Sequence, residues 1–208
     1  PPQSRITGYG FYDRAGGHCD LPPQLKRFLN TGAPPIVFAL GSAAVHTAGN
    51  FYRMAVEAAV QLKERAVLVV GQDTDNLPRS GLPQDMVAVD YAPYSKLFPE
   101  AAVIVHQGGI GTTGQALQAG KPTLVVPFAH DQPDNARRLE RLGISQTLPF
   151  KRCSVRGMAR ALKVLTENQS LSARAAMIGQ KVRTEDGVAA ACVAIEALLS
   201  TKLNITSG

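Results

Sequence analysis

The sequence has no tryptophan, only three cysteines and no long apolar run, and each shortage excludes a class of protein. A bilayer-spanning helix takes about 20 consecutive apolar residues, and no run in this sequence approaches that length. No signal peptide is visible. The cysteines are odd in number, far apart and form no CxxC pair, which favours reduced thiols over a disulfide framework. We therefore expect a cytoplasmic protein, with at most a peripheral contact to the inner face of the membrane.

Aromatic residues make up only 6% of the sequence, and the net charge of +6 comes from scattered Arg and Lys. Because no basic stripe is interleaved with aromatics, nucleic acid is not an expected partner. The charge is either a solvated surface or an affinity for a diphosphate or an anionic membrane face. The four histidines have no metal-ligand spacing, and the possible ligands at 18–20 are adjacent, so they cannot easily converge on one ion. We expect no metal and no cofactor.

What is present is an ordinary globular composition, with 208 residues of which 45% are hydrophobic and 18% charged. Short apolar runs alternate with helix-period segments. The predicted strands are 36–40, 66–70, 86–89, 103–105, 123–126 and 145–148. The predicted helices are 24–29, 51–63, 94–98, 112–119 and 133–142, followed by amphipathic helices at 154–165 and 186–199 that would pack on the sheet or reach toward a missing part. This alternation indicates a Rossmann-like, doubly wound parallel sheet of about six strands with helices on both faces.

The domain prediction follows from the composition of the two ends. Residues 1–30 carry glycines and prolines and are interpreted as a lead-in that packs on the domain. Residues 31–200 form the α/β domain, and 201–208 form a C-terminal tail. The sequence starts with Pro1 rather than Met, which we interpret as a cut from a longer chain.

A glycine-rich turn, HQGGIGTT at 106–113, follows the strand predicted at 103–105 and leads into a helix. In doubly wound sheets, ligands bind where strands end and helices begin. Glycines let a ligand touch the backbone, and the unpaired N–H groups of the first helical turn attract an anion. A similar turn, Gly41-Ser42, follows the first strand. Two such turns on one sheet edge suit a diphosphate, although the same glycines could simply make tight strand-to-helix turns.

The segment 109–114, GIGTTG, also matches the GxGxxG fingerprint of dinucleotide-binding proteins, and Asp131 follows at about the spacing of a ribose-binding acid. That fingerprint normally belongs to the first βαβ unit. Here the turn follows roughly the fourth strand, and Asp131 lies in a loop that opens another helix. A nicotinamide or flavin enzyme is therefore only a minor alternative.

Several short motifs occur together in one order. They are Leu40-Gly41-Ser42, Tyr91-Ala92-Pro93, the turn at 108–113, Gly120-Lys121-Pro122, Val126-Pro127, Asp131-Gln132 and Asn135-Ala136. In this order and spacing the chain resembles the C-terminal, nucleotide-sugar-binding half of two-domain GT-B glycosyltransferases. The resemblance is greatest to bacterial relatives of UDP-glucuronosyltransferases, namely sterol glucosyltransferases, rhamnosyltransferases and antibiotic glycosyltransferases. It runs from about Gly8 to Leu199.

This resemblance implies a role for each matching residue. Tyr91 would stack on the nucleotide base, and the backbone of Ala92 would hydrogen-bond the edge of that base. Asp131 and Gln132 would grip hydroxyls of the donor sugar. The residues implied in diphosphate binding are Ser42, Gly109, Gly111, Thr112 and Thr113.

The sequence departs from the family pattern in two places. Gln107 stands where many relatives have a histidine that donates to the diphosphate, and several relatives have two histidines there. Either Gln107 or its neighbour His106 could therefore make the contact, with Gln107 the preferred one. Gln115 stands where plant relatives have a glutamate that binds the ribose hydroxyls, and an amide can also bind them.

The resemblance implies transfer of a hexose from a UDP- or dTDP-sugar to an acceptor hydroxyl, with inversion and without a metal. The general base and the acceptor pocket would lie in a missing N-terminal domain, so no catalytic base is assigned and the chain alone should transfer no sugar. The acceptor could be a lipid. The alternatives are a natural subunit of a split glycosyltransferase and a non-catalytic nucleotide-sugar-binding protein.

Overall fold

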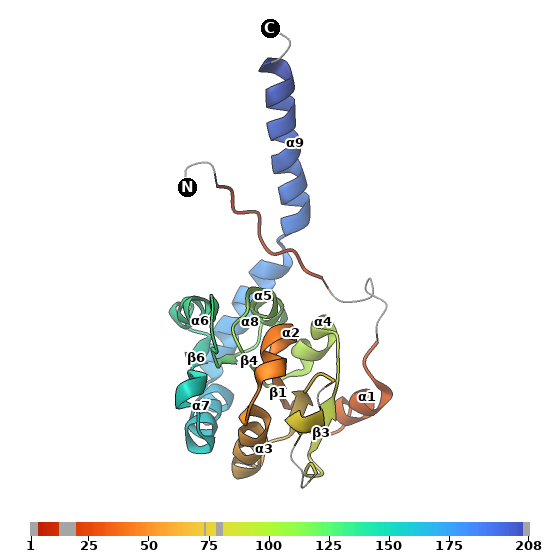
Figure 1. Cartoon of the computed structure of the whole chain (residues 1–208), viewed down its shortest axis with the longest axis vertical. Coiled ribbons are helices and arrows are strands. Elements are labelled where there is room, and N and C mark those ends of the chain that lie inside the picture. Colours follow the sequence, from red (N-terminus) through yellow and green to blue (C-terminus); the bar gives the residue numbers. More distant parts are fainter. Residues whose placement is uncertain (1–3, 13–19, 73, 78–80, 206–208) are drawn as a thin grey trace.

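The computed structural model of this chain describes residues 4–12, 20–72, 74–77 and 81–205, and within them six parallel strands form one sheet (Figure 1). The strands are β1 Ile36–Ala39, β2 Ala66–Val69, β3 Met86–Val89, β4 Val103–His106, β5 Thr123–Val125 and β6 Ser145–Thr147. Their order is β3-β2-β1-β4-β5-β6. This is the doubly wound order in which the winding reverses between β1 and β4. The predicted fold class is confirmed.

Helices cover both faces of the sheet. They are α1 Pro23–Leu29, α2 Gly41–Ala44, α3 Phe51–Leu62, α4 Tyr94–Leu97, α5 Ile110–Ala119, α6 Gln132–Arg141, α7 Val155–Glu167, α8 Gln169–Arg183 and α9 Gly187–Ile205. Short 3-10 turns lie at Val45–Thr47, Thr74–Asn76, Phe98–Glu100 and Phe150–Arg152. Because successive strand residues point to opposite faces, Phe38 and Val105 pack with α3 and α7, whereas Ile104 packs with α1, α4 and α5.

The predicted elements are found close to their expected bounds, but the short helix α2 and the longer helix α8 were not predicted. The residues that α8 buries are Ala175, Gly179 and Val182. Two of these three are small, and Met177 on the same helix is 60% exposed. The apolar periodicity that signals a helix is therefore weak in this segment.

Described residues of the predicted lead-in segment contact the rest of the structure. Tyr9 and Phe11 lie against the cluster formed by α5, α6 and α8, and Leu25 of α1 is fully buried. Tyr9 also covers Gly114 of α5, where a Cβ would lie only 2.6 Å from the ring carbon Cδ1. The boundaries at residues 30 and 200 remain predictions.

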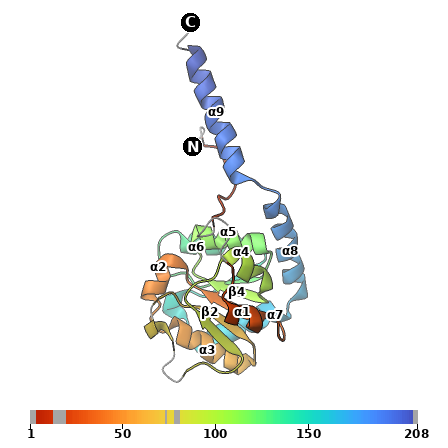
Figure 2. The same ribbon diagram turned by 90° about the vertical axis from the view of Figure 1, so that its right-hand side faces the viewer.

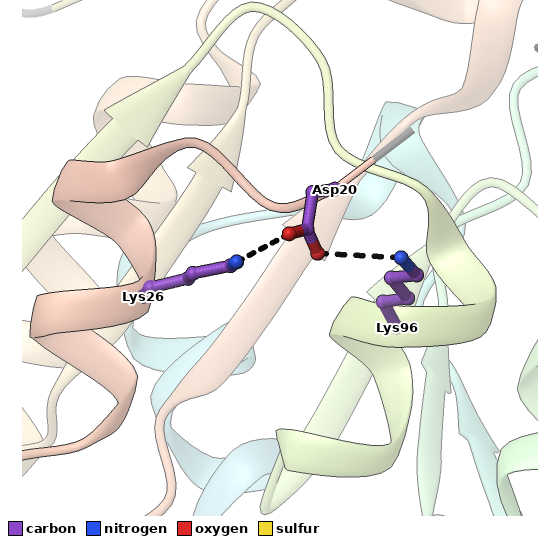
Figure 3. Close-up of polar contacts among 3 residues, drawn as sticks. All are labelled: Asp20, Lys26 and Lys96. Carbon is purple, nitrogen blue, oxygen red and sulfur yellow. Dashed lines mark hydrogen bonds and ion pairs between the residues drawn. The ribbon is translucent and has the colours of Figure 1, made fainter. Parts of the chain in front are cut away.

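Asp20 links two helices at the surface. Its carboxylate is paired with Lys26 of α1 and, at 3.3 Å, with Lys96 of α4 (Figure 3). The hydrogen bonds from Lys26 and Lys96 lower the pKa of Asp20. His18 and Cys19, its neighbours in the rejected metal-ligand motif, lie outside the described residues.

Helix α9 rises away from the body of the domain, whereas α8 runs along its side (Figure 2). The segment 186–199 was expected either to pack on the sheet or to reach toward a missing part, and it does not pack on the sheet. Val188, Ile195 and Leu199 are each 57% exposed, and their spacing of seven and four residues puts them on one face. No helix in the described part of the chain is long and apolar enough to cross a membrane.

Candidate functional site

The two glycine turns lie side by side at the point where the winding of the sheet reverses. β1 pairs with β4, with Ala39 opposite His106, so both turns leave the same edge of the sheet. The contact between them is direct. A Cβ on Gly41, whose φ is +68°, would collide with Nε2 of Gln107 and lie 3.1 Å from Oγ1 of Thr112. The predicted proximity of the turns is confirmed.

The Gln107 side chain fills part of the space between these turns. It is 6% exposed, and its Nε2 donates to Oγ1 of Thr112 at 3.4 Å. A Cβ on Gly109 would lie 2.7 Å from the same nitrogen. At both Gly41 and Gly109 the end of the Gln107 side chain lies where a Cβ would be, and the role of Gly109 in binding a diphosphate stays a prediction. Gly111 differs, since a Cβ there would meet nothing within 4 Å.

His106 faces the protein interior. It is fully buried, and its Nδ1 accepts a hydrogen bond from the N–H of Gly108 at 3.1 Å. Burial lowers the pKa of His106 to about 4, so the ring is neutral at physiological pH, with Nε2 carrying its proton. Nε2 has no hydrogen-bond partner among the described residues. This geometry favours Gln107 over His106 as the side chain that faces a ligand.

The N-terminus of α5 supplies hydrogen-bond donors at the turn. The first intrahelical bond runs from the N–H of Thr113 to Gly109 at 2.9 Å, which leaves the N–H groups of Ile110, Gly111 and Thr112 without helical partners. Gly109, the N-cap residue, has no side chain to cap them. The partial positive charge of the helix end adds to these donors. Ser42, on the first turn, is exposed at the start of α2.

The segment predicted to hold the nucleotide base lies between β3 and α4. Tyr91 is 40% exposed, whereas Ala92 is fully buried. Tyr94 was not predicted as a site residue, and its ring stacks on that of Phe98 with 4.3 Å between the ring centroids. Burial raises the pKa of Tyr94 to about 12, against a hydrogen bond from the backbone N–H of Gly41. This contact brings the Tyr91 loop, which is predicted to hold the base, next to the Gly41-Ser42 turn. The four-residue spacing of Tyr94 and Phe98 in the sequence could have predicted that their rings pack together on one helical face.

Gln132 holds together the loop that carries the predicted sugar-binding pair. It is 7% exposed, and its Oε1 accepts hydrogen bonds from the N–H groups of Phe128 at 2.8 Å and Ala129 at 3.1 Å. Within this loop His130 has a φ of +58°, a left-handed conformation that non-glycine residues seldom adopt. The amide oxygen of Gln132 is therefore used to shape the loop, and its NH₂ group is the part that could reach a ligand.

Asp131 is tied to the glycine turn through Asn135. The Asp131 side chain is exposed, and its Oδ2 accepts from Nδ2 of Asn135 at 2.8 Å. The same Nδ2 donates to the carbonyl of Gly108 at 2.8 Å. Asn135 appeared in the sequence only as part of the Asn135-Ala136 motif, and its role was missed because no spacing rule links it to Gly108.

The structure thus gathers most of the predicted residues around one edge of the sheet. The first turn, the Gln107–Thr113 turn and the Asp131-Gln132 loop meet there, and Tyr94 connects the Tyr91 loop to them. Gln115 is 8% exposed on α5. Within the described residues, no group of three or more His, Cys, Asp or Glu side chains is placed to hold a metal ion.

Comparison with known proteins identifies the family. Residues 53–195 match the model of the erythromycin biosynthesis protein CIII-like C-terminal domain. The chain belongs to this family. The resemblance to the donor half of GT-B glycosyltransferases, inferred from the ordered motifs, is confirmed.

Curated relatives are sugar transferases that are much longer than this chain. The O-mycaminosyltylonolide 6-deoxyallosyltransferase of Streptomyces fradiae is 37% identical over 204 residues, which cover 97% of this chain and 46% of the relative. The sterol 3-beta-glucosyltransferase of Yarrowia lipolytica is 32% identical over 205 residues, which cover 94% of this chain and 14% of the relative. The chain therefore spans less than half of the length of these proteins.

Solved structures of glycosyltransferases share the fold. Spinosyn rhamnosyltransferase SpnG complexed with spinosyn aglycone has a TM-score of 0.79 and 23% identity, over 94% of this chain and 53% of that one. Glycosyltransferase VinC in complex with dTDP has a TM-score of 0.70 and 22% identity, over 86% of this chain and 45% of that one.

Proposed function

We propose that this chain is the donor-binding half of a glycosyltransferase that transfers a hexose from a UDP- or dTDP-sugar to an acceptor hydroxyl. The observation that carries the proposal is the meeting of two glycine turns and the Asp131-Gln132 loop at the switch point of the sheet. Ligands of doubly wound folds bind at this place. The family and the sugar-transferring relatives support the same reaction.

Three regions of the site would divide the donor among them. The open space beside Gly111, with the free N–H groups of the α5 N-terminus, would take the diphosphate. Tyr91 and Ala92 would hold the base, with Gln115 at the ribose. Asp131 and the NH₂ group of Gln132 would hold hydroxyls of the sugar.

During transfer, this half would stabilise the departing nucleoside diphosphate. Negative charge develops on the leaving oxygen as the glycosidic bond breaks, and fixed donors that point at it lower the barrier. The Gln107 amide, the Thr112 hydroxyl and the α5 N–H groups are such donors. A general base must accept the proton of the acceptor hydroxyl on the opposite side of the sugar. We assign that base to the part of the full-length protein that this chain lacks.

The exposed apolar face of α9 is consistent with a further part of the protein that packs against it. The relatives are more than twice as long as the stretch they share with this chain, and α9 projects from the domain with Val188, Ile195 and Leu199 uncovered. An apolar face of this kind is stabilised by covering it. We propose that the remaining part of the protein packs against α9, in a cytoplasmic enzyme whose acceptor could be a lipid.

The proposal is tested by titrating the chain with UDP and dTDP in a calorimeter and in ¹H–¹⁵N spectra. We expect a dissociation constant of about 10 µM to 1 mM for at least one of them. Amide shifts should centre on Gly111, Thr112 and Thr113, and the nucleosides without phosphates should bind more weakly. No sugar should be transferred by the chain alone.

A pair of matched variants makes the test specific. Thr112→Val removes a hydroxyl at the turn and should weaken nucleotide binding about tenfold, the loss of one hydrogen bond to a charged group. Thr166→Val makes the same change on the exposed face of α7, where the hydroxyl bonds only Lys163 O, and should leave binding unchanged. No heat and no shifts with either nucleotide would refute the donor-half interpretation.

A further inference from the structure

The side-chain amide of Asn135 joins two parts of the site that are far apart in sequence. Asn135 is 8% exposed, and its Nδ2 lies 2.8 Å from the carbonyl oxygen of Gly108 and 2.8 Å from Oδ2 of Asp131. An amide nitrogen carries two protons, so both hydrogen bonds can exist at once. One buried group therefore holds the glycine turn and the predicted sugar-binding carboxylate together.

The peptide of Gly108 is fixed from several sides. Its N–H donates to Nδ1 of His106, and its carbonyl accepts from Asn135. Its φ is +90°, and a Cβ there would lie 2.8 Å from Cγ1 of Val125 and 3.1 Å from the carbonyl of Gln132. Gly108 is thus a rigid anchor for Asn135 rather than a mobile part of the turn.

Asp131 does not use its side chain to cap helix α6, although it stands at the N-cap position. It is the N-cap residue of α6, where an Asp side chain commonly accepts a hydrogen bond from the N–H groups of the first turn. Here its side chain makes no such bond and accepts from Asn135 instead. The carboxylate is exposed, so without Asn135 it would be free to turn toward the helix end or into solvent.

We propose that Asn135 is a positioning residue that aims the Asp131 carboxylate relative to the glycine turn, so that the sugar and the diphosphate of one donor are held at a fixed separation. This inference rests on the proposed function, because it explains how Asp131 is held in the role given to it there. Asn135 itself acts through Asp131 and Gly108 and does not contact the donor.

The test compares the affinities of UDP and UDP-glucose, and of dTDP and dTDP-glucose, in the wild type, Asn135→Ala, Asp131→Ala and the double variant. Asn135→Ala should weaken binding of the nucleotide sugar about tenfold more than binding of the nucleotide, the effect expected when a hydrogen bond to a charged group is lost. Asp131→Ala should give the same selective loss. The double variant should bind the nucleotide sugar no more weakly than the weaker-binding single variant, because both substitutions remove the same interaction.

Arg138→Ala is the matched control on the same helix. Its exposed guanidinium pairs with Asp134 at 2.7 Å, away from the Asn135 contacts, so both affinities should stay as in the wild type. If Asn135→Ala weakens nucleotide and nucleotide sugar equally, or changes neither, Asn135 does not aim Asp131 and the inference is overturned. Additive losses in the double variant would overturn it as well.

A ligand-free arm separates this inference from the proposed function. In the free protein, Asn135→Ala should raise the amide exchange rates of Gly108 and of residues 128–132 about tenfold, because both hydrogen bonds of the Asn135 amide, to Gly108 and to Asp131, are lost. Unchanged exchange would overturn the positioning role even if donors bind. If the wild type binds no nucleotide or nucleotide sugar, the proposed function fails, and the exchange rates alone decide whether Asn135 fixes the loop.

Discussion

The buried, neutral His106 should make the protein unusually sensitive to mild acid. Burial lowers its pKa to about 4, whereas the unfolded chain binds the same proton near the ordinary value of about 6.5. Between these two values the unfolded state holds more protons than the folded state, so stability falls as the pH falls. From about pH 7 to about pH 5 this one residue should cost roughly 2 kcal/mol of unfolding free energy, by linkage of the two pKa values.

The measurement is urea unfolding of the wild type and of His106→Asn near pH 7 and near pH 5. Asparagine can accept the Gly108 N–H through its Oδ1 and does not titrate, so it keeps the contact and removes the proton. The wild type should lose about 2 kcal/mol more than the variant over this interval. Carboxylates titrate in both proteins and cancel in the comparison. Equal losses in the two proteins would show that His106 is not held neutral, and the reasoning would be refuted.

Three glycine substitutions should separate stability from binding. Gly41→Ala should lower stability by about 1–3 kcal/mol and weaken UDP or dTDP binding, because its φ of +68° is strained for alanine and the methyl would displace Gln107. Gly111→Ala should raise the free energy of unfolding by about 0.5–1 kcal/mol, because alanine prefers a helix more than glycine does. It should nevertheless weaken nucleotide binding, because the methyl group would enter the open space beside the turn. Unaltered binding would place the ligand elsewhere. Gly179→Ala should lower the free energy of unfolding in urea by about 1–3 kcal/mol, because the new Cβ would lie 2.6 Å from the Gly120 backbone. Its nucleotide affinity should equal that of the control Ser172→Ala on the same helix. An unchanged urea midpoint would contradict the close packing of α5 and α8.

The sheet could be predicted from the sequence because its strands are covered on both faces. A strand buried in this way is a continuous apolar run, and Ile36–Ala39 and Val103–His106 are entirely buried. Helix α8 could not be predicted in the same way, because it packs closely through Gly179 rather than through a row of large apolar residues. Helix propensity and hydrophobic periodicity do not reveal a contact in which a glycine lets two backbones approach each other closely.

The site was predictable at the level of backbone and only partly at the level of side chains. The position of both glycine turns followed from the strand order, since parallel strands end at one edge. Which of His106 and Gln107 is fully buried did not follow, because neighbouring strand residues point to opposite sides and the sequence does not say which side is interior. The Asn135 link to Gly108 spans 27 residues and depends on how α6 meets the turn.

The glycines of this site have three different surroundings in the structure. Gly108 is needed for packing, since a side chain there would strike Val125 and Gln132. At Gly41 and Gly109 the Gln107 amide lies where a Cβ would be, and Gly41 also has a φ of +68° that strains other residues. Gly111 alone faces open space at the helix end, where the free N–H groups and the helix dipole favour an anion. If the proposed function is right, Gly111 is the glycine of this turn that lies beside the diphosphate, while Gly108 and Gly109 pack against the side chains around them.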